Sequence, residues 1–503
     1  MKRFVGRWIS FVLGSSALVW GGGTKAAPPN QPSPQVIVST RHHGTFGGAS
    51  LDYAAVVEET RLSGPDGAPA ASVVSFSYLK SGRADPGRPV LFVFNGGPGS
   101  ASIWQHLGVF GPRRLAIADG VKPAAVPPFH LEDNPNAPLD VADVVLIDPP
   151  GTGFSRLLPG AKPSDFYGVQ QDAQATVDFI EAWLSAHDRW DSPKFLVGES
   201  YGTIRAAVVA KLAMGGPTSP AGRISGLSFN GVVLLGQAMD SSGDAARDAA
   251  ALLPSLAATA WYHKRADAGK TLDATLTEAR AFAGGDYLQA LWAGDRLPLD
   301  ARQAVAARMS ALIGLPAGEI LDDNLRITAP EFEAGLLRSD GLAVGAYDSR
   351  YTLSDKGGGG DPVADDPAMG QYVPAFVAAF HAYLKDELQV KLDVPYEAIS
   401  FHAVNGPWDY GEGPGRHPPT NFALDLAAAM RRNPKMLLMI GAGAYDLVTP
   451  LGSAEYVAAH SSLPQDRVDI RTYEAGHMVY MGDRNAKALA ADLRAFVAKA
   501  DRP

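Results

Sequence analysis

Residues 194–207 read Lys-Phe-Leu-Val-Gly-Glu-Ser-Tyr-Gly-Thr-Ile-Arg-Ala-Ala, a pattern that predicts a short buried strand, a tight turn and the start of a helix. Ser200 stands at the apex of the turn, with Gly198 and Gly202 two residues to either side. Because glycine has no Cβ, the chain can turn sharply here and expose the serine hydroxyl. The stretch therefore predicts a nucleophile elbow. The alternative is a strand-to-helix turn with an incidental serine, since a chain with 54 glycines can produce G-x-S-x-G by chance.

Length and composition indicate a globular protein with a large core. The 503 residues are 46% hydrophobic and carry a formal net charge of -9, with no block of lysine or arginine beyond the N-terminus. A nucleic acid is therefore not an expected partner. The chain has no cysteine, which excludes thiol nucleophiles, disulfides and thiolate metal sites. Its eleven histidines lack metal-ligand spacing, so we expect no metal and no other cofactor.

The N-terminus has the pattern of an export signal. A positively charged start precedes an apolar run from Ile9 to Trp20, which is too short to span a bilayer, and small residues follow it. We therefore expect a signal peptide over 1–27, a proline-rich linker over 28–35, and export to a bacterial periplasm or the outside of the cell. An uncleaved membrane anchor is the alternative. We expect no stable membrane association after signal removal, because no other stretch is sufficiently apolar.

Apolar runs and helical patterns alternate along much of the remaining chain. Strands buried on both faces of a sheet require continuous apolar runs, and such runs occur at 89–94, 144–147, 195–197, 231–235, 436–440 and 468–473. A helix is expected at 165–187. Two alternating strands at 49–62 and 71–80 are expected to pair antiparallel at the first edge of the sheet. The pattern predicts an α/β fold, with helices on both faces of a mainly parallel central sheet.

Residues 240–395 differ from the rest in being rich in alanine and in helical periodicity. Apolar residues at three- and four-residue steps predict helices, and these lie at 245–264, 272–283, 299–313 and 367–388. We expect a helical insertion over 240–395 that divides the core into 36–239 and 396–503. A module inserted after a central strand is typical of a lid over a hydrolase pocket, and a merely stabilising insertion is the alternative.

Two polar residues follow the last two predicted strands. Asp446 comes after 436–440, and His477 comes after 468–473. Because the carboxyl ends of parallel strands meet at one edge of a sheet, both should lie near Ser200. The order Ser, Asp, His is that of an α/β-hydrolase, in which the histidine takes the serine proton and the aspartate orients the histidine. Taken singly, Asp446 could be a helix cap and His477 a structural histidine.

Several motifs of this chain, in this order, resemble those of the serine carboxypeptidases. They are Asn95-Gly96-Gly97-Pro98-Gly99-Ser100, Asp148-Pro149 with Gly151-Thr152-Gly153-Phe154-Ser155, Gly198-Glu199-Ser200-Tyr201-Gly202, Tyr445-Asp446-Leu447 and Ala475-Gly476-His477-Met478. The resemblance covers the core from about Phe46 to the C-terminus, apart from the insertion. It implies an α/β-hydrolase that removes single residues from free peptide C-termini, with Ser200, Asp446 and His477 as its catalytic triad.

The resemblance also implies roles for other residues around Ser200. The backbone amides of Gly97 and Tyr201 would form the oxyanion hole, and the elbow by itself predicts the Tyr201 amide as a donor. The substrate carboxylate would be held by Asn95, Gly96 and Glu199. Asn95 can donate a hydrogen bond at any pH, whereas Glu199 must be protonated to donate one to a carboxylate. Binding of a free C-terminus should therefore weaken as pH rises.

The departures from the family pattern are typical of a bacterial branch. In the well-known eukaryotic members a tryptophan stands where this chain has Val93, and a glutamate that pairs with the elbow glutamate aligns with Val109. Thr203 replaces a usual glycine, and the disulfides are missing. We therefore expect an exported serine carboxypeptidase that acts on peptides with a free C-terminus through an acyl-enzyme. The alternative is another serine hydrolase, such as an esterase, or an acyltransferase with the same triad.

Overall fold

The structure is a computed structural model of the 503-residue chain. It describes residues 34–83, 85–117, 119, 126–218, 224–267, 269–358 and 360–500. The expected signal peptide and nearly all of the expected linker lie outside the described residues. Residues 32–503 form one compact unit. In this unit, none of the described helices combines the length and apolar character that a bilayer span needs.

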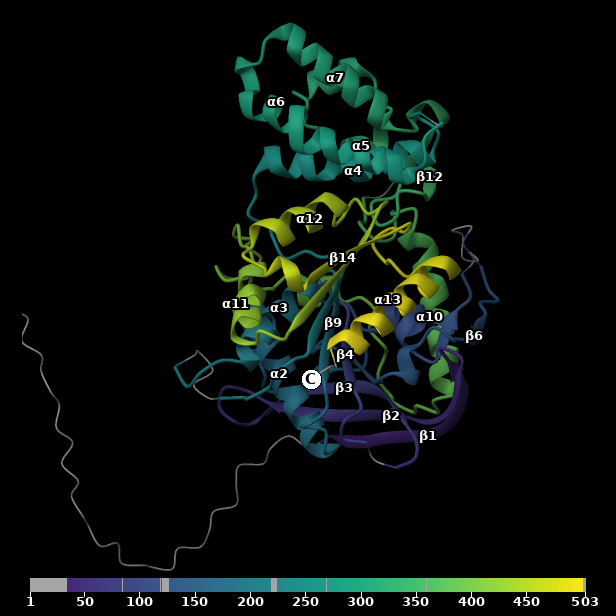
Figure 1. The fold of residues 1–503 in the computed structure, drawn as a ribbon. Helices are drawn as coiled ribbons and strands as arrows, with labels where there is room; N and C mark the ends of the chain where they lie inside the picture. Colours follow the sequence, from purple (N-terminus) through teal and green to yellow (C-terminus); the bar gives the residue numbers. More distant parts are fainter. Residues whose placement is uncertain are drawn as a thin grey trace, which may run out of the picture. The chain divides into compact units, whose positions relative to one another are not determined.

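Ten strands of the described chain form one mixed sheet at the centre of the unit (Figure 1). Their order is β1-β2-β3-β7-β4-β9-β10-β13-β14, and β8 pairs with β3. The strands are β1 (Gln35–Phe46), β2 (Ala49–Ser63), β3 (Pro69–Lys80), β4 (Val90–Phe94), β7 (Asp143–Ile147), β8 (Arg156–Leu157), β9 (Lys194–Glu199), β10 (Gly231–Leu235), β13 (Leu437–Gly443) and β14 (Val468–Tyr473). From β7 to β14 the strands run parallel, so their carboxyl ends meet at one edge.

The first edge of the sheet differs from the prediction. We expected the strands at 49–62 and 71–80 to form it, but β1 pairs antiparallel with β2 on the outside. Most side chains of β1 are partly or fully exposed, so its sequence lacks the apolar run that marks the other strands. The turn into β2 uses Gly47 and Gly48, both with positive φ of 56° and 86°. Gln35, expected in the linker, therefore belongs to the sheet.

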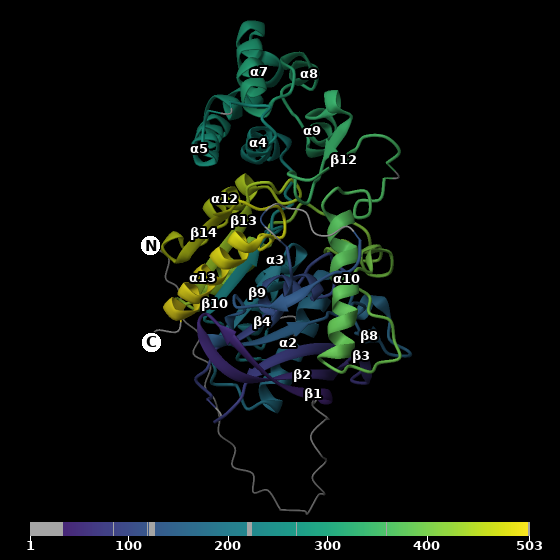
Figure 2. The same cartoon turned by 90° about the vertical axis from the view of Figure 1, so that its right-hand side faces the viewer.

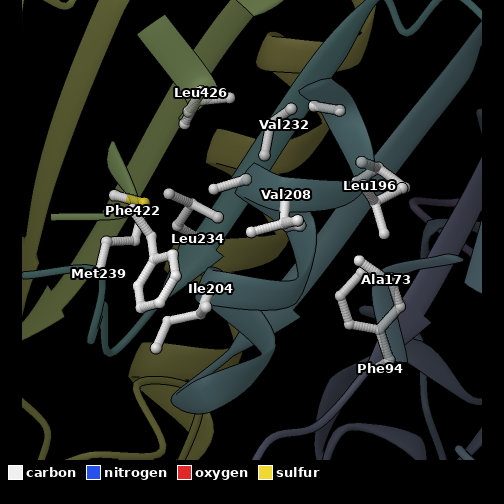
Figure 3. Packing of buried hydrophobic residues seen from close by; sticks show 14 of the residues in the cluster. Phe94, Ala173, Leu196, Ile204, Val208, Val232, Leu234, Met239, Phe422 and Leu426 are labelled. Carbon is white, nitrogen blue, oxygen red and sulfur yellow. The ribbon is translucent and has the colours of Figure 1, made fainter. Parts of the chain in front are cut away.

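Helices cover both faces of the sheet, as the sequence predicts, and the fold is that of an α/β-hydrolase (Figure 1). Buried side chains form a separate apolar cluster on each face. The main helices are α2 (Val169–Ala186), α3 (Tyr201–Ala213), α11 (Ala423–Arg432) and α12 (Leu451–His460) in one cluster, and α10 (Met369–Asp386) and α13 (Asp483–Ala500) in the other. Figure 3 shows Ile204 and Val208 of α3 packed with Val232 and Leu234 of β10.

Between β10 and β13 the chain forms a group of helices with its own apolar cluster (Figure 2). These elements are α4 (Ala245–Tyr262), α5 (Leu272–Phe282), α6 (Leu288–Ala293), α7 (Leu299–Ile313), α8 (Ala317–Asp322), α9 (Ala329–Gly335) and the hairpin of β11 (Leu342–Val344) and β12 (Thr352–Ser354). The group packs on the core through α4 and α12. Helix α10 also lies within 240–395, but Phe376 and Phe380 join the cluster on the sheet.

Candidate active site

Ser200 lies at the turn between β9 and α3, in a backbone conformation that a residue with a side chain rarely adopts. Its φ is 57° and its ψ is -127°. Such a conformation costs about 1–3 kcal/mol and persists only where its surroundings enforce it. The flanking glycines make room for this turn, because a Cβ on Gly198 would lie 2.2 Å from the Gly202 carbonyl oxygen. The Ser200 amide also donates a hydrogen bond to the Leu235 carbonyl oxygen, at 2.9 Å.

Asp446 is fully buried and hydrogen-bonded through both carboxylate oxygens. Oδ1 accepts hydrogen bonds from the amides of Val448 and Thr449, both at 2.9 Å. Oδ2 accepts one from His477 Nδ1 at 2.9 Å and another from the Thr449 hydroxyl. Asp446 is not the N-cap of the following helix, which is Pro450, although it holds two backbone amides and binds the histidine at the same time. Sequence reasoning missed Thr449, which no motif marks.

His477 is buried, with 4% of its surface exposed. Burial by itself lowers the pKa of His477, but the charge of Asp446, its hydrogen bond and the charge of Glu199 together raise the pKa above its ordinary value. The surroundings therefore stabilise the imidazolium, which is the form that a general base reaches after it takes a proton. Because Nδ1 of His477 is hydrogen-bonded to Asp446, Nε2 is the ring nitrogen that can accept a proton.

A small cavity of about 60 Å³ brings most of the predicted site residues together. It is lined by Ser200, His477, Asn95, Gly96, Gly97 and Glu199. Its other walls are largely apolar or aromatic and include Trp104, Tyr347, Met369, Phe401 and Met478. Asp446 binds His477, and Tyr201 is the first residue of α3. The Tyr201 hydroxyl donates to Asp172 at 3.3 Å, so its side chain has a structural contact of its own.

The loop that follows β4 lies directly against the elbow. A Cβ on Gly96 would lie 2.5 Å from the Tyr201 nitrogen, so only glycine fits between the two segments. Gly97 has a φ of 102°, which also favours glycine. This contact brings the Asn-Gly-Gly segment next to the N-terminus of α3. An oxyanion hole shared between the amides of Gly97 and Tyr201 needs this proximity.

Asn95 and Glu199 form a buried pair beside the nucleophile. Asn95 Nδ2 donates a hydrogen bond to Glu199 Oε1 at 2.7 Å. Burial raises the pKa of Glu199 to about 7, against the opposing effects of His477, Tyr480 and Asn95. Its other oxygen, Oε2, is buried and has no hydrogen bond. Val109, at the position where family members have the partner glutamate, lies in the apolar cluster on one face of the sheet.

A loop of the helical insertion, which no sequence motif marks, contacts both the loop that carries Asp446 and the loop that carries His477. This loop spans 345–351, between β11 and β12. The His477 amide donates to the Tyr347 carbonyl oxygen at 2.6 Å, and the Tyr347 ring stands edge-on to the imidazole at 5.4 Å. The Ser349 amide donates to the Tyr445 carbonyl oxygen at 3.0 Å. The insertion therefore supports the catalytic edge and also contributes a wall of the cavity.

Gly476→Ala should destabilise the protein and lower its activity. An added Cβ would lie 2.2 Å from the Tyr347 carbonyl oxygen, so backbone in the insertion or in the histidine loop has to move. We expect a loss of about 1–3 kcal/mol in the free energy of unfolding. Gly318→Ala is the matched control, because a Cβ there meets no atom within 4 Å. Equal urea midpoints for the two variants would show that the loop contact is not tight.

Comparison with known proteins indicates a protein family for this chain. Residues 71–271 match the family model described as serine carboxypeptidase. The match supports membership of that family. The matched segment includes the elbow and the loop at 95–100, while Asp446 and His477 lie beyond it.

Relatives among curated proteins carry the same family description. Serine carboxypeptidase-like 5 of Arabidopsis thaliana is 31% identical over 147 residues, which cover 28% of this chain and 31% of that protein. Serine carboxypeptidase-like 12 of the same plant is 32% identical over 145 residues, covering 28% and 32%. The alignments thus span about a third of the length of these relatives. Both are plant proteins, so the bacterial branch stays a prediction.

One solved structure resembles nearly the whole chain. It is a prohormone-processing carboxypeptidase from Saccharomyces cerevisiae, matched with a TM-score of 0.55 over 91% of this chain and 92% of that one. The sequences are 15% identical, so the likeness establishes the fold and not the activity.

Proposed function

We propose that the protein is a serine carboxypeptidase that releases C-terminal residues from peptides through an acyl-enzyme on Ser200. The observation that carries this proposal is one cavity lined by Ser200, His477 and the Asn95–Glu199 pair. The scissile carbonyl would lie at Ser200, and the free carboxylate of the last residue would meet the Asn95–Glu199 pair. The serine carboxypeptidase match over 71–271 supports the same activity.

The geometry is consistent with acyl transfer in two steps. Ser200 Oγ attacks the scissile carbonyl carbon while His477 Nε2 takes the hydroxyl proton, and Asp446 stabilises the resulting imidazolium. The amides of Gly97 and Tyr201 donate hydrogen bonds to the oxyanion. The imidazolium then returns the proton to the leaving nitrogen as the C–N bond breaks. Water attacks the acyl-enzyme by the same route and releases the shortened peptide.

A peptide with a free C-terminus should be cleaved with a lower KM than its C-terminal amide below pH 7. With its pKa at about 7, Glu199 is protonated in that range and donates to the substrate carboxylate. Above pH 7 it ionises and repels the substrate, so the KM for the acid should rise. The turnover number should fall at low pH, because His477, whose pKa is raised, becomes protonated and cannot accept a proton.

The test measures kcat and KM for a matched peptide acid and amide from acid to alkaline pH, in the wild type and in Glu199→Gln. A glutamine keeps the polar contacts but does not titrate, so the KM for the acid should lose its rise near pH 7. Equal cleavage of acid and amide at every pH would rule out the carboxylate site. Cleavage of esters with no action on peptides would favour an esterase on the same triad.

A further inference from the structure

Tyr480 lies in the loop after β14, three residues beyond His477, and its side chain is held in one place. Only 1% of its surface is exposed. Its ring packs against Gly108, where an added Cβ would lie 2.3 Å from Tyr480 Cε2 and 2.5 Å from Cδ2. Gly108 belongs to the π-helical turn His106–Phe110 that also carries Val109. A glycine at 108 thus makes the space that the tyrosine ring fills.

The Tyr480 hydroxyl lies beside the Asn95–Glu199 pair. The hydroxyl interacts with the side chains of both Glu199 and Asn95. Its position in the structure does not, however, meet the geometry of a hydrogen bond to either of them. Glu199 Oε2 is likewise buried without one. Leaving a buried polar atom unpaired costs about 1–3 kcal/mol, so a hydrogen bond between the hydroxyl and the carboxyl with which it interacts would be favoured. The hydroxyl is the donor that this carboxylate oxygen lacks.

Charged and titratable groups reach Glu199 from three loops. His477 and Tyr480 come from the loop after β14, Asp446 from the loop after β13, and the neutral amide of Asn95 from the loop after β4. His477 favours the ionised form of Glu199, and Asp446 opposes it. Burial raises the pKa of the Tyr480 phenol well above 10, so it stays a neutral donor wherever the triad can work. A second carboxyl in this place would instead share a proton with Glu199.

We propose that Tyr480 is a positioning and specificity residue for the C-terminal carboxylate of the substrate, whose hydroxyl donates a hydrogen bond to Glu199 when that carboxyl loses its proton. This inference rests on the proposed function. A donor to the ionised form makes ionisation easier than an apolar neighbour would. Tyr480 therefore lowers the pH at which the pocket stops binding a free C-terminus. Tyr480 belongs to the loop after β14, whereas Val109 belongs to the π-helical turn His106–Phe110.

The experiment compares the wild type with Tyr480→Phe, which keeps the ring on Gly108 and removes only the hydroxyl. The rise in KM for a peptide acid should move to higher pH by about one unit, with kcat nearly unchanged. A direct readout is the infrared band of the protonated Glu199 carboxyl, identified by its loss in Glu199→Gln. In Tyr480→Phe this band should persist to higher pH by the same amount.

Two further variants sharpen the result. Tyr372→Phe is the matched control, because its buried hydroxyl also lacks a hydrogen bond and interacts with Asp348 and Tyr351 rather than with Glu199. It should shift neither readout. In the Glu199→Gln background, Tyr480→Phe should have no pH effect. An unchanged infrared titration in Tyr480→Phe would overturn the inference, whatever the substrate. A shifted band with acid and amide cleaved alike would instead overturn the proposed function and, with it, the role in substrate binding.

Discussion

Replacing Ser200 with alanine should lower turnover of a peptide acid by about a millionfold while leaving the protein folded. His477→Ala should have nearly the same effect, and Asp446→Asn should cost about ten-thousandfold, because members of a triad act as a unit. The position of Ser200, at a turn with a φ of 57°, means that alanine keeps the same backbone constraint. The KM should change little, since the Asn95–Glu199 pair is untouched.

The measurement is single-turnover cleavage together with covalent labelling by a fluorophosphonate. Labelling should be lost in Ser200→Ala and greatly slowed in His477→Ala, with unchanged circular dichroism in both. Thr449→Val is a graded comparison, because it removes a hydroxyl that bonds Asp446 and lies 3.0 Å from His477 Nδ1, while the hydrogen bond between Asp446 and His477 stays. If Asp446→Ala stayed within about threefold of the wild type, another group would have to orient the histidine.

Arg205→Met should destabilise the protein by about 3–5 kcal/mol and also reduce activity. Arg205 and Asp172 are a buried ion pair, with side chains 1% and 2% exposed and Nε 2.8 Å from Oδ2. Removing one partner leaves the other buried without a counter-charge. Arg205 Nη1 also donates to the Asn95 carbonyl oxygen at 2.6 Å, so the loop beside the elbow loses an anchor.

The double variant Arg205→Met with Asp172→Leu separates the two effects. Replacing a buried ion pair by apolar side chains is often neutral for stability, so the urea midpoint should return part of the way toward the wild type, since the Tyr201 hydroxyl still loses its Asp172 partner. The Asn95 anchor stays missing, and kcat/KM for a peptide acid should remain low. Recovery of both quantities would show that Arg205 supports the fold alone and plays no part in placing Asn95.

The sequence predicted much of the fold because burial leaves a local signature. The apolar runs at 89–94 and 231–235 became β4 and β10 within one residue, since a strand covered on both faces must be apolar throughout. β1 left no such signature, because its side chains are mostly exposed and its pairing is made by the backbone.

The residues of the candidate site also fall into those that the sequence predicts and those that it does not. Asp446 and His477 could be placed near Ser200 because strand topology carries each to the same edge of the sheet. Thr449, Arg205 and Tyr480 could not be recognised, since each acts through a partner that only the folded chain brings near it. An isolated tyrosine three residues after a histidine has no pattern of its own.

The loop at 345–351 links a wall of the cavity to the support of His477. The His477 amide bonds to the Tyr347 carbonyl oxygen, and Tyr347 itself walls the cavity. A displacement of this loop would therefore change the cavity wall and remove a hydrogen bond from the His477 backbone at the same time. The shape of the cavity and the orientation of His477 are therefore set by one and the same loop.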